Sequence, residues 1–169
     1  EAEVQVLLPA LDNGQLKCLT VRAAARHTPG QKGLRISLPP SLLQQMQQKD
    51  GNVLRSEVDN RMASLRAALR LRHEVWPAAW TLEVSAAGQE PPPLPQLFAG
   101  MALTLDALLS GEAMDPQCVA GAGTDLSGSP QRVLPLDTLV PAAALQQREK
   151  LLVLPPDAAE ELGDWLLLH

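Results

Sequence analysis

The amino-acid sequence predicts an α+β fold, a two-layer α/β sandwich in which helices pack on one mixed β-sheet. Apolar residues alternate with a period of two near the N-terminus and recur with helical spacing in the middle of the chain. The predicted elements run β-β-β-α-α-β-α-β-β-α-β-α, with helices interleaved among the later strands. The chain has 169 residues, enough for one sizeable core. We expect a single domain over residues 1–169, and, because it starts at Glu1 without Met, a fragment of a larger chain.

Three strands are predicted first. Residues 4–8 form an apolar run, and Asn13-Gly14 is a typical hairpin turn before a second strand at 16–23. Residues 34–39 alternate apolar and polar side chains, which predicts a third strand after a polar loop.

Two helices are predicted next. Ser41 is the expected N-cap of a short helix, and a longer helix is predicted over 53–74. The longer helix carries an apolar stripe of Val58, Met62, Leu65 and Leu69. It also carries five arginines, which lie mostly off that stripe: Arg55, Arg61, Arg66, Arg70 and Arg72. Such arginines either bind nucleic acid or form a solvated face paired with acids, and the second reading is the commoner one.

The rest of the chain predicts alternating strands and helices. A strand at 80–85 precedes a proline-rich loop at 86–96 and an apolar helix at 99–109. Later elements are expected at 117–123 and 131–136 (strands), 137–147 (helix) and 150–155 (strand), with a final short helix from Asp157.

Composition restricts the function classes. Aromatic residues are only 2% of the chain and the formal net charge is -5, which argues against base stacking and strong phosphate-backbone binding. The three histidines and two cysteines have no metal-ligand spacing, and no apolar run approaches the roughly 20 residues of a membrane helix. We therefore expect no metal, no cofactor, no membrane partner and a cytoplasmic location.

Two further motifs contain residue types that can carry chemistry. The glycine-rich stretch 121–128 lacks the lysine of a phosphate-binding P-loop, so a flexible connection between strands is favoured. A serine–lysine pair needs a partly buried lysine, and only Lys150, at the start of an apolar strand, comes close. Ser127 and Ser129 are its candidate partners.

Two runs, "PQLFAGMALTLDALLSGEAMDP" and the later "LLVLPPDAAEEL", are similar to segments of one known family. On them, and from about residue 91 to 162, the chain resembles the proteolytic domain of Lon proteases. It is also similar to two non-proteolytic relatives, the N-terminal domain of magnesium-chelatase-like ComM-type ATPases and the C-terminal domain of RadA-type recombination proteins. The Lon nucleophile motif D-G-P-S-A-G, followed by an apolar helix, resembles "PQLFAGMALTLDALLSGEAMDP" here. Ala99-Gly100 match the end of the motif, so the nucleophile position falls on Phe98.

A second block, "AGAGTDLSGSPQRVLPLDTLVPAAALQQ", resembles the segment that carries the catalytic lysine in Lon. Val133-Leu134-Pro135 match well, and the base position then falls on Val140. Phe98 has no hydroxyl and Val140 has no amine, so the resemblance implies a catalytically degenerate member of the family. We expect the two side chains to pack against each other and seal the former site.

Three functions follow as expectations. The first is a non-catalytic Lon-like module for assembly or partner binding, either by self-association or with an AAA+ ATPase. The second is a divergent ATP-dependent serine peptidase with a relocated dyad of Lys150 and Ser127 or Ser129. The third is a nucleic-acid-processing accessory domain, supported by the arginines of residues 55–72 and opposed by the net charge.

Overall fold

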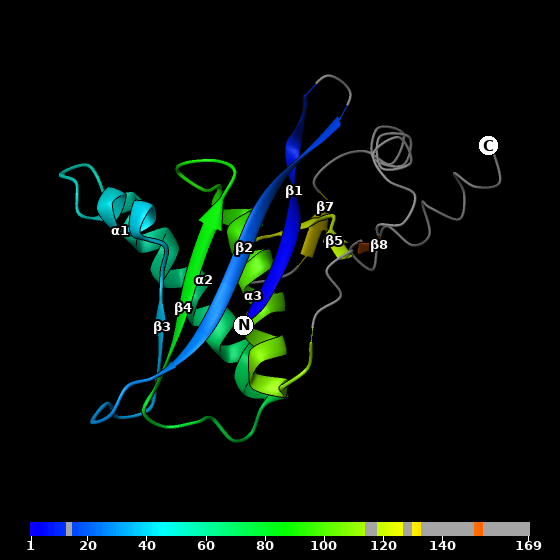
Figure 1. Ribbon diagram of the computed structural model, residues 1–169. Helices are drawn as coiled ribbons and strands as arrows, with labels where there is room; N and C mark the ends of the chain where they lie inside the picture. Colours follow the sequence, from blue (N-terminus) through cyan, green and yellow to red (C-terminus); the bar gives the residue numbers. More distant parts are fainter. Residues whose placement is uncertain (13–14, 114–117, 127–129, 133–150, 154–169) are drawn as a thin grey trace.

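A long antiparallel hairpin begins the chain and forms the middle of a mixed sheet (Figure 1). The computed structural model describes residues 1–12, 15–113, 118–126, 130–132 and 151–153, and all that follows concerns those residues. Its elements are β1 (Ala2–Asp12), β2 (Gln15–His27), β3 (Leu34–Ser37), α1 (Pro40–Met46), α2 (Asn52–Arg72), β4 (Trp80–Ala87), α3 (Leu94–Ser110), β5 (Cys118–Ala120), β6 (Ala122–Thr124), β7 (Pro130–Arg132) and β8 (Leu151–Val153).

The main sheet has the strand order β3-β4-β2-β1-β5-β8. β2 pairs antiparallel with β1 and with β4, whereas β3 is parallel to β4 and β5 is parallel to both β1 and β8. β6 and β7 form a separate antiparallel pair. The prediction of a mixed α+β fold is confirmed at this level, and the element order through α3 is the predicted one.

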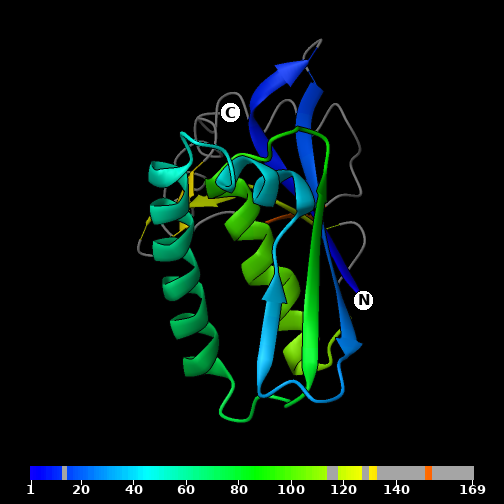
Figure 2. The same ribbon diagram turned by 90° about the vertical axis from the view of Figure 1, so that its left-hand side faces the viewer.

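One face of the sheet is apolar because strand side chains alternate in direction. Val4 and Val6 of β1 lie opposite Val21 and Leu19 of β2 in the register, and all four are buried. Leu82 and Val84 of β4 extend the same core. Figure 2 shows α2 and α3 on one side of the sheet, with α3 next to the strands. The described helices therefore form a layer on one face, and the core lies between.

α3 approaches the sheet closely at Gly100. A Cβ placed there would lie 2.5 Å from Val21 Cγ2 and 3.1 Å from Val6 Cγ2, so only glycine fits without movement. The neighbouring residues of the helix, Leu97 and Met101, are fully buried. Gly100 thus sets the distance between helix and sheet.

Two predicted helix starts were wrong. α3 begins at Leu94, five residues before the predicted start at 99, because Pro95 is tolerated in the first turn, where no intrahelical N–H is needed. α1 begins at Pro40 after an N-cap at Pro39, and Ser41 makes no capping hydrogen bond. Phe98 consequently lies within the helix and not at its junction with the loop.

Some predicted elements cannot be compared. The helices predicted over 137–147 and from Asp157 lie outside the described residues, as do residues 133–136 of one predicted strand. The strand predicted over 117–123 is described as two short strands, β5 and β6, which belong to different sheets.

Candidate functional site

Phe98, at the position that the Lon resemblance assigns to the nucleophile, is a core residue. Its side chain is 3% exposed and belongs to the apolar cluster between α3 and the sheet. A cavity of about 40 Å³ lies beside it, enough for two or three water molecules. The walls come from α2 (Arg61, Ser64, Leu65), from α3 (Phe98, Ala102) and from Thr124 and Asp125.

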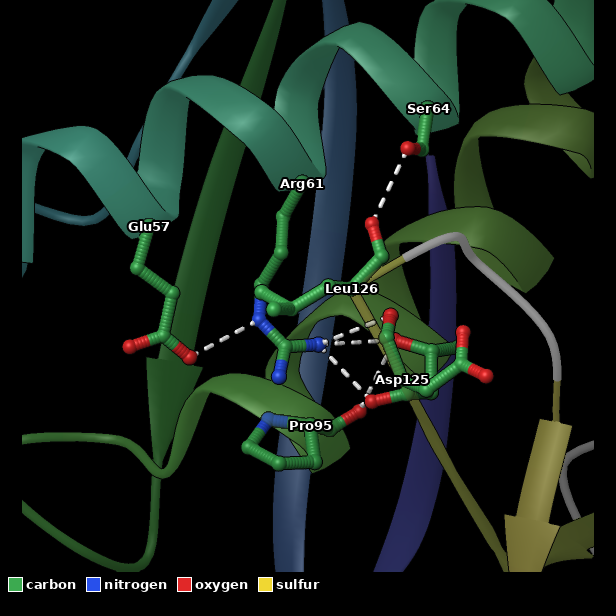
Figure 3. A network of polar contacts seen from close by, with 7 residues as sticks. Glu57, Arg61, Ser64, Pro95, Asp125 and Leu126 are labelled. Carbon is green, nitrogen blue, oxygen red and sulfur yellow. Dashed lines mark hydrogen bonds and ion pairs between the residues drawn. The ribbon is translucent and has the colours of Figure 1, made fainter.

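A buried arginine joins α2 to the end of β6 (Figure 3). Arg61 is 7% exposed, and its Nε donates to Glu57 Oε1 over 3.1 Å. Its Nη1 donates to the carbonyl oxygens of Thr124 (2.7 Å) and Asp125 (3.2 Å) and to Thr124 Oγ1 (3.3 Å). Burying a guanidinium costs free energy unless its charge and its N–H donors have partners. Here Glu57 supplies the opposite charge, and acceptors contact Nε and Nη1.

Ser64 extends this contact by one helical turn. Its Oγ donates to the carbonyl oxygen of Leu126 over 3.0 Å. Arg61 and Ser64, three residues apart on α2, therefore hold the consecutive carbonyl groups of residues 124–126. We call this set of contacts the α2 clamp.

The clamped segment also contacts the first turn of α3. Thr124 Oγ1 lies 3.5 Å from the carbonyl oxygen of Pro95. At Gly123 a Cβ would come within 3.1 Å of Pro95 Cβ and 3.4 Å of Gln96 Nε2, so the backbone lies close to the helix. Residues 122–126 therefore contact both α2 and the first turn of α3, and they lie beside the cavity that Phe98 lines.

The walls of this cavity do not form a nucleophile–base pair. Ser64 and Thr124 are the hydroxyl-bearing side chains among the described wall residues, and the Ser64 hydroxyl donates to a carbonyl group. Neither lysine nor histidine is among those wall residues. A serine nucleophile of the Lon type needs an adjacent amine to accept its proton. The described arrangement therefore fixes a chain segment and does not activate a hydroxyl.

The other residues singled out from the sequence lie outside the described residues. These are Val140, Ser127, Ser129 and Lys150. The expected contact between Phe98 and Val140, and the relocated serine–lysine dyad, stay predictions.

Most of the α2 arginines have partners within the protein. Arg55 donates to the carbonyl of Met46 and to Asn52 Oδ1. The Arg70 guanidinium lies 4.2 Å from the centre of the Trp76 ring. Arg72 Nε lies 2.9 Å from Asp106 Oδ1, which His73 Nε2 also contacts at 2.7 Å, and the two contacts link the end of α2 to α3.

Arg61 was not recognised as a core residue from the sequence. The signal was present, because Arg61 follows Val58 by three positions and precedes Leu65 by four, which places it on the buried stripe of α2. Glu57, four residues before it, supplies a partner at helical spacing. An arginine on an apolar stripe with an acid one turn away indicates a buried polar contact.

Together the fold and the site define an α+β protein with a mixed sheet and a polar clamp beside a buried aromatic residue. Among the described residues there is no group of three or more potential metal ligands, and no helix there could span a membrane. Neither a protein-family model nor a curated protein sequence matches the chain.

Proposed function

We propose that the chain is a non-catalytic Lon-like module that serves assembly or partner binding together with an AAA+ ATPase. The observation that carries this proposal is the burial of Phe98 at the position that the resemblance gives to the catalytic serine. A phenyl ring supplies neither a nucleophile nor a hydrogen-bond donor, so Lon-type acyl transfer cannot start there.

The α2 clamp supports the same proposal. An active site must leave room for a substrate chain beside the nucleophile. Here the space next to Phe98 is about 40 Å³, and Arg61 and Thr124 are among its walls. Thr124 is in turn held by Arg61. Among the described residues, the cavity lined by Phe98 has room for only a few water molecules.

The order of elements supports a Lon-like two-layer sandwich as the finer fold. The elements from β1 to α3 are three strands, two helices, a strand and a helix. They precede β6 and β7, which lie in the second segment that resembles Lon proteases. The Ala-Gly pair that ends the Lon nucleophile motif has its counterpart in Ala99-Gly100, and the close contact of Gly100 with Val21 leaves no room for a side chain there.

A nucleic-acid-binding role has less support. Arg55, Arg61, Arg70 and Arg72 each contact a group of the protein itself, and the net charge of the chain is -5. Binding to a phosphate backbone needs cations that are free to displace counterions.

Light scattering coupled to size-exclusion chromatography tests the proposal. The chain is measured alone over a range of concentrations, and mixed with an AAA+ ATPase from the same or an adjacent gene. We expect a mass above that of the monomer, or co-elution with the ATPase. A monomer at every concentration that also elutes apart from the ATPase would reject the assembly role.

A further inference from the structure

The outer face of the sheet, opposite the helices, carries a hollow of about 380 Å³. Its lining includes the short side chains Ala24, Ser37 and Ser85, which we call the floor, and the charged residues Arg22 and Glu83, which we call the rim. Val84 also lines it, as do the apolar residues Leu38 and Pro40, where β3 leads into α1. This volume lies within the range of known ligand sites, roughly 300–1,000 Å³.

The strand register explains why the hollow exists. Arg22 lies opposite Ser85, and Ala24 lies opposite Glu83, so that the two charged residues are diagonal neighbours on β2 and β4. The other diagonal pair consists of two small residues, Ala24 and Ser85. Diagonal neighbours of this kind are about 7–8 Å apart, a distance that long side chains of opposite charge can span.

Arg22 and Glu83 nevertheless each pair with other residues. Arg22 Nε donates to Glu3 Oε2 over 2.8 Å and lies 3.4 Å from Glu1 Oε1. Glu83 Oε1 lies 3.0 Å from Arg26 Nε. Space over the floor therefore stays open, with a positive group on one side and a negative group on the other.

Both ion pairs are easily exchanged for others. The side chains of Arg22 and Glu83 are 52% and 49% exposed, and ion pairs with such exposure contribute little to stability. The hydrogen bond from Arg22 to Glu3 raises the pKa of Arg22, whose guanidinium is charged at physiological pH in any case. An incoming carboxylate can replace Glu3, and an incoming ammonium group can replace Arg26.

We propose that this hollow binds an extended peptide segment of a partner protein, which presents an acidic side chain to Arg22 and, two residues away, a basic side chain to Glu83. Side chains two residues apart on an extended strand point the same way and are about 6.6–6.8 Å apart, which matches the diagonal between the two rim charges. Leu38 and Pro40 are placed to contact the aliphatic stem of one of those side chains. The proposal rests on the partner-binding function above and gives it a site.

Amide chemical shifts measured on the full chain test the proposal. The probe is the peptide acetyl-Thr-Glu-Thr-Lys-Thr-amide, and its neutral counterpart has glutamine in place of Glu and Lys. We expect saturable shifts at residues 22–24 and 83–85 with the charged peptide and none with the neutral one. Shifts that do not saturate, or that are equal for the two peptides, would overturn the proposal.

Variants separate the rim charges from their surroundings. Arg22→Gln and Glu83→Gln should each weaken binding of the charged peptide at least fivefold. Arg26→Gln is the matched control, since Arg26 lies on the same strand and pairs with Glu83 but does not line the hollow. It should leave the affinity within twofold or increase it. Unchanged affinity in both rim variants, with native amide spectra, would overturn the proposal.

The outcome is distinguishable from that of the assembly test. A chain that assembles or co-elutes with the ATPase but ignores the peptide retains the proposed function and loses this site. A chain that binds the peptide through Arg22 and Glu83 but stays monomeric and elutes apart from the ATPase retains the site and loses the assembly role.

Discussion

Arg61 shows how a single charged residue can belong to a core. Its Nε donates to a partly exposed carboxylate, Glu57, and its Nη1 donates to backbone carbonyl groups of residues 124 and 125. Those carbonyl groups gain a charged donor, which is worth more than a neutral one. The residue is therefore expected to matter for stability through the groups that it satisfies.

Replacing Arg61 by leucine should lower the free energy of unfolding by about 2–4 kcal/mol, because carbonyl groups that it satisfies lose their donor and Glu57 loses its partner. Urea denaturation measures the change. The matched control is Arg66→Leu on the same helix, whose side chain is only partly buried, and it should stay within about 0.5 kcal/mol of the parent protein. Equal effects of the two substitutions would contradict the buried role of Arg61.

Gly100→Ala should destabilise the protein by about 1–3 kcal/mol, because the new methyl group would meet Val21 Cγ2 at 2.5 Å. Helix propensity alone predicts the opposite sign, a gain of about 1 kcal/mol. Thermal or urea unfolding decides between them. Val21→Ala provides the control, since the double variant should be more stable than the sum of the single effects implies. Strict additivity would mean that Gly100 and Val21 do not compete for space.

At the residue scale the sequence predicted apolar positions better than polar ones. Val58, Leu65 and Leu69 are buried as the stripe on α2 indicated, and Met62 is only partly so. The burial of Arg61 was missed because the helical spacing of apolar residues predicts only which apolar side chains are buried. It gives no information on the backbone carbonyl groups that accept hydrogen bonds from a buried polar side chain. Those carbonyl groups are 63 and 64 residues further along the chain.

At the scale of elements, the α2 clamp fixes how a strand lies on two helices. β6 has only three residues and pairs with β7 alone among the described strands. A ladder of this length has little stability of its own. Its position therefore depends on Arg61, on Ser64 and on the close contact of Gly123 with the first turn of α3.

Arg61→Lys should loosen this strand selectively. An ammonium group keeps the charge but cannot donate to Glu57 and to the carbonyl groups in the fork geometry of arginine. Hydrogen exchange of the amides at 122–126 should speed up about tenfold, a loss of about 1.4 kcal/mol of local stability. The β1–β2 and β2–β4 amides should be unaffected. An equal acceleration throughout the sheet would show that the clamp supports the whole fold and not this segment.

The order of elements was predictable and their pairing was not. Local periodicity and turn residues identified the first seven elements in order. β4 pairs between β3 and β2, and β5 lies parallel to β1 more than a hundred residues before it. Such pairings depend on packing between distant segments, which one sequence does not display. The start of α3 was missed because the prolines of residues 86–96 predicted a loop, although the first turn of a helix accepts proline.

At the scale of the whole molecule, the sheet separates two environments. Its inner face packs against α3, which carries Phe98, and the helix side of the molecule also contains the α2 clamp, whereas its outer face carries the hollow lined by Arg22 and Glu83. We propose that partner binding uses the outer face and that the site around Phe98 carries no chemistry. A fold of this kind can serve as a binding platform as well as an enzyme.

Hydrolysis of unfolded casein tests the central claim, the absence of peptidase activity, most directly. The full chain is incubated with casein alone, and with ATP and an AAA+ ATPase. We expect no cleavage above the ATPase control in either mixture. Cleavage that is lost in Lys150→Ala, and in Ser127→Ala or Ser129→Ala, while each variant stays folded, would contradict the absence of peptidase activity and establish a relocated serine–lysine dyad.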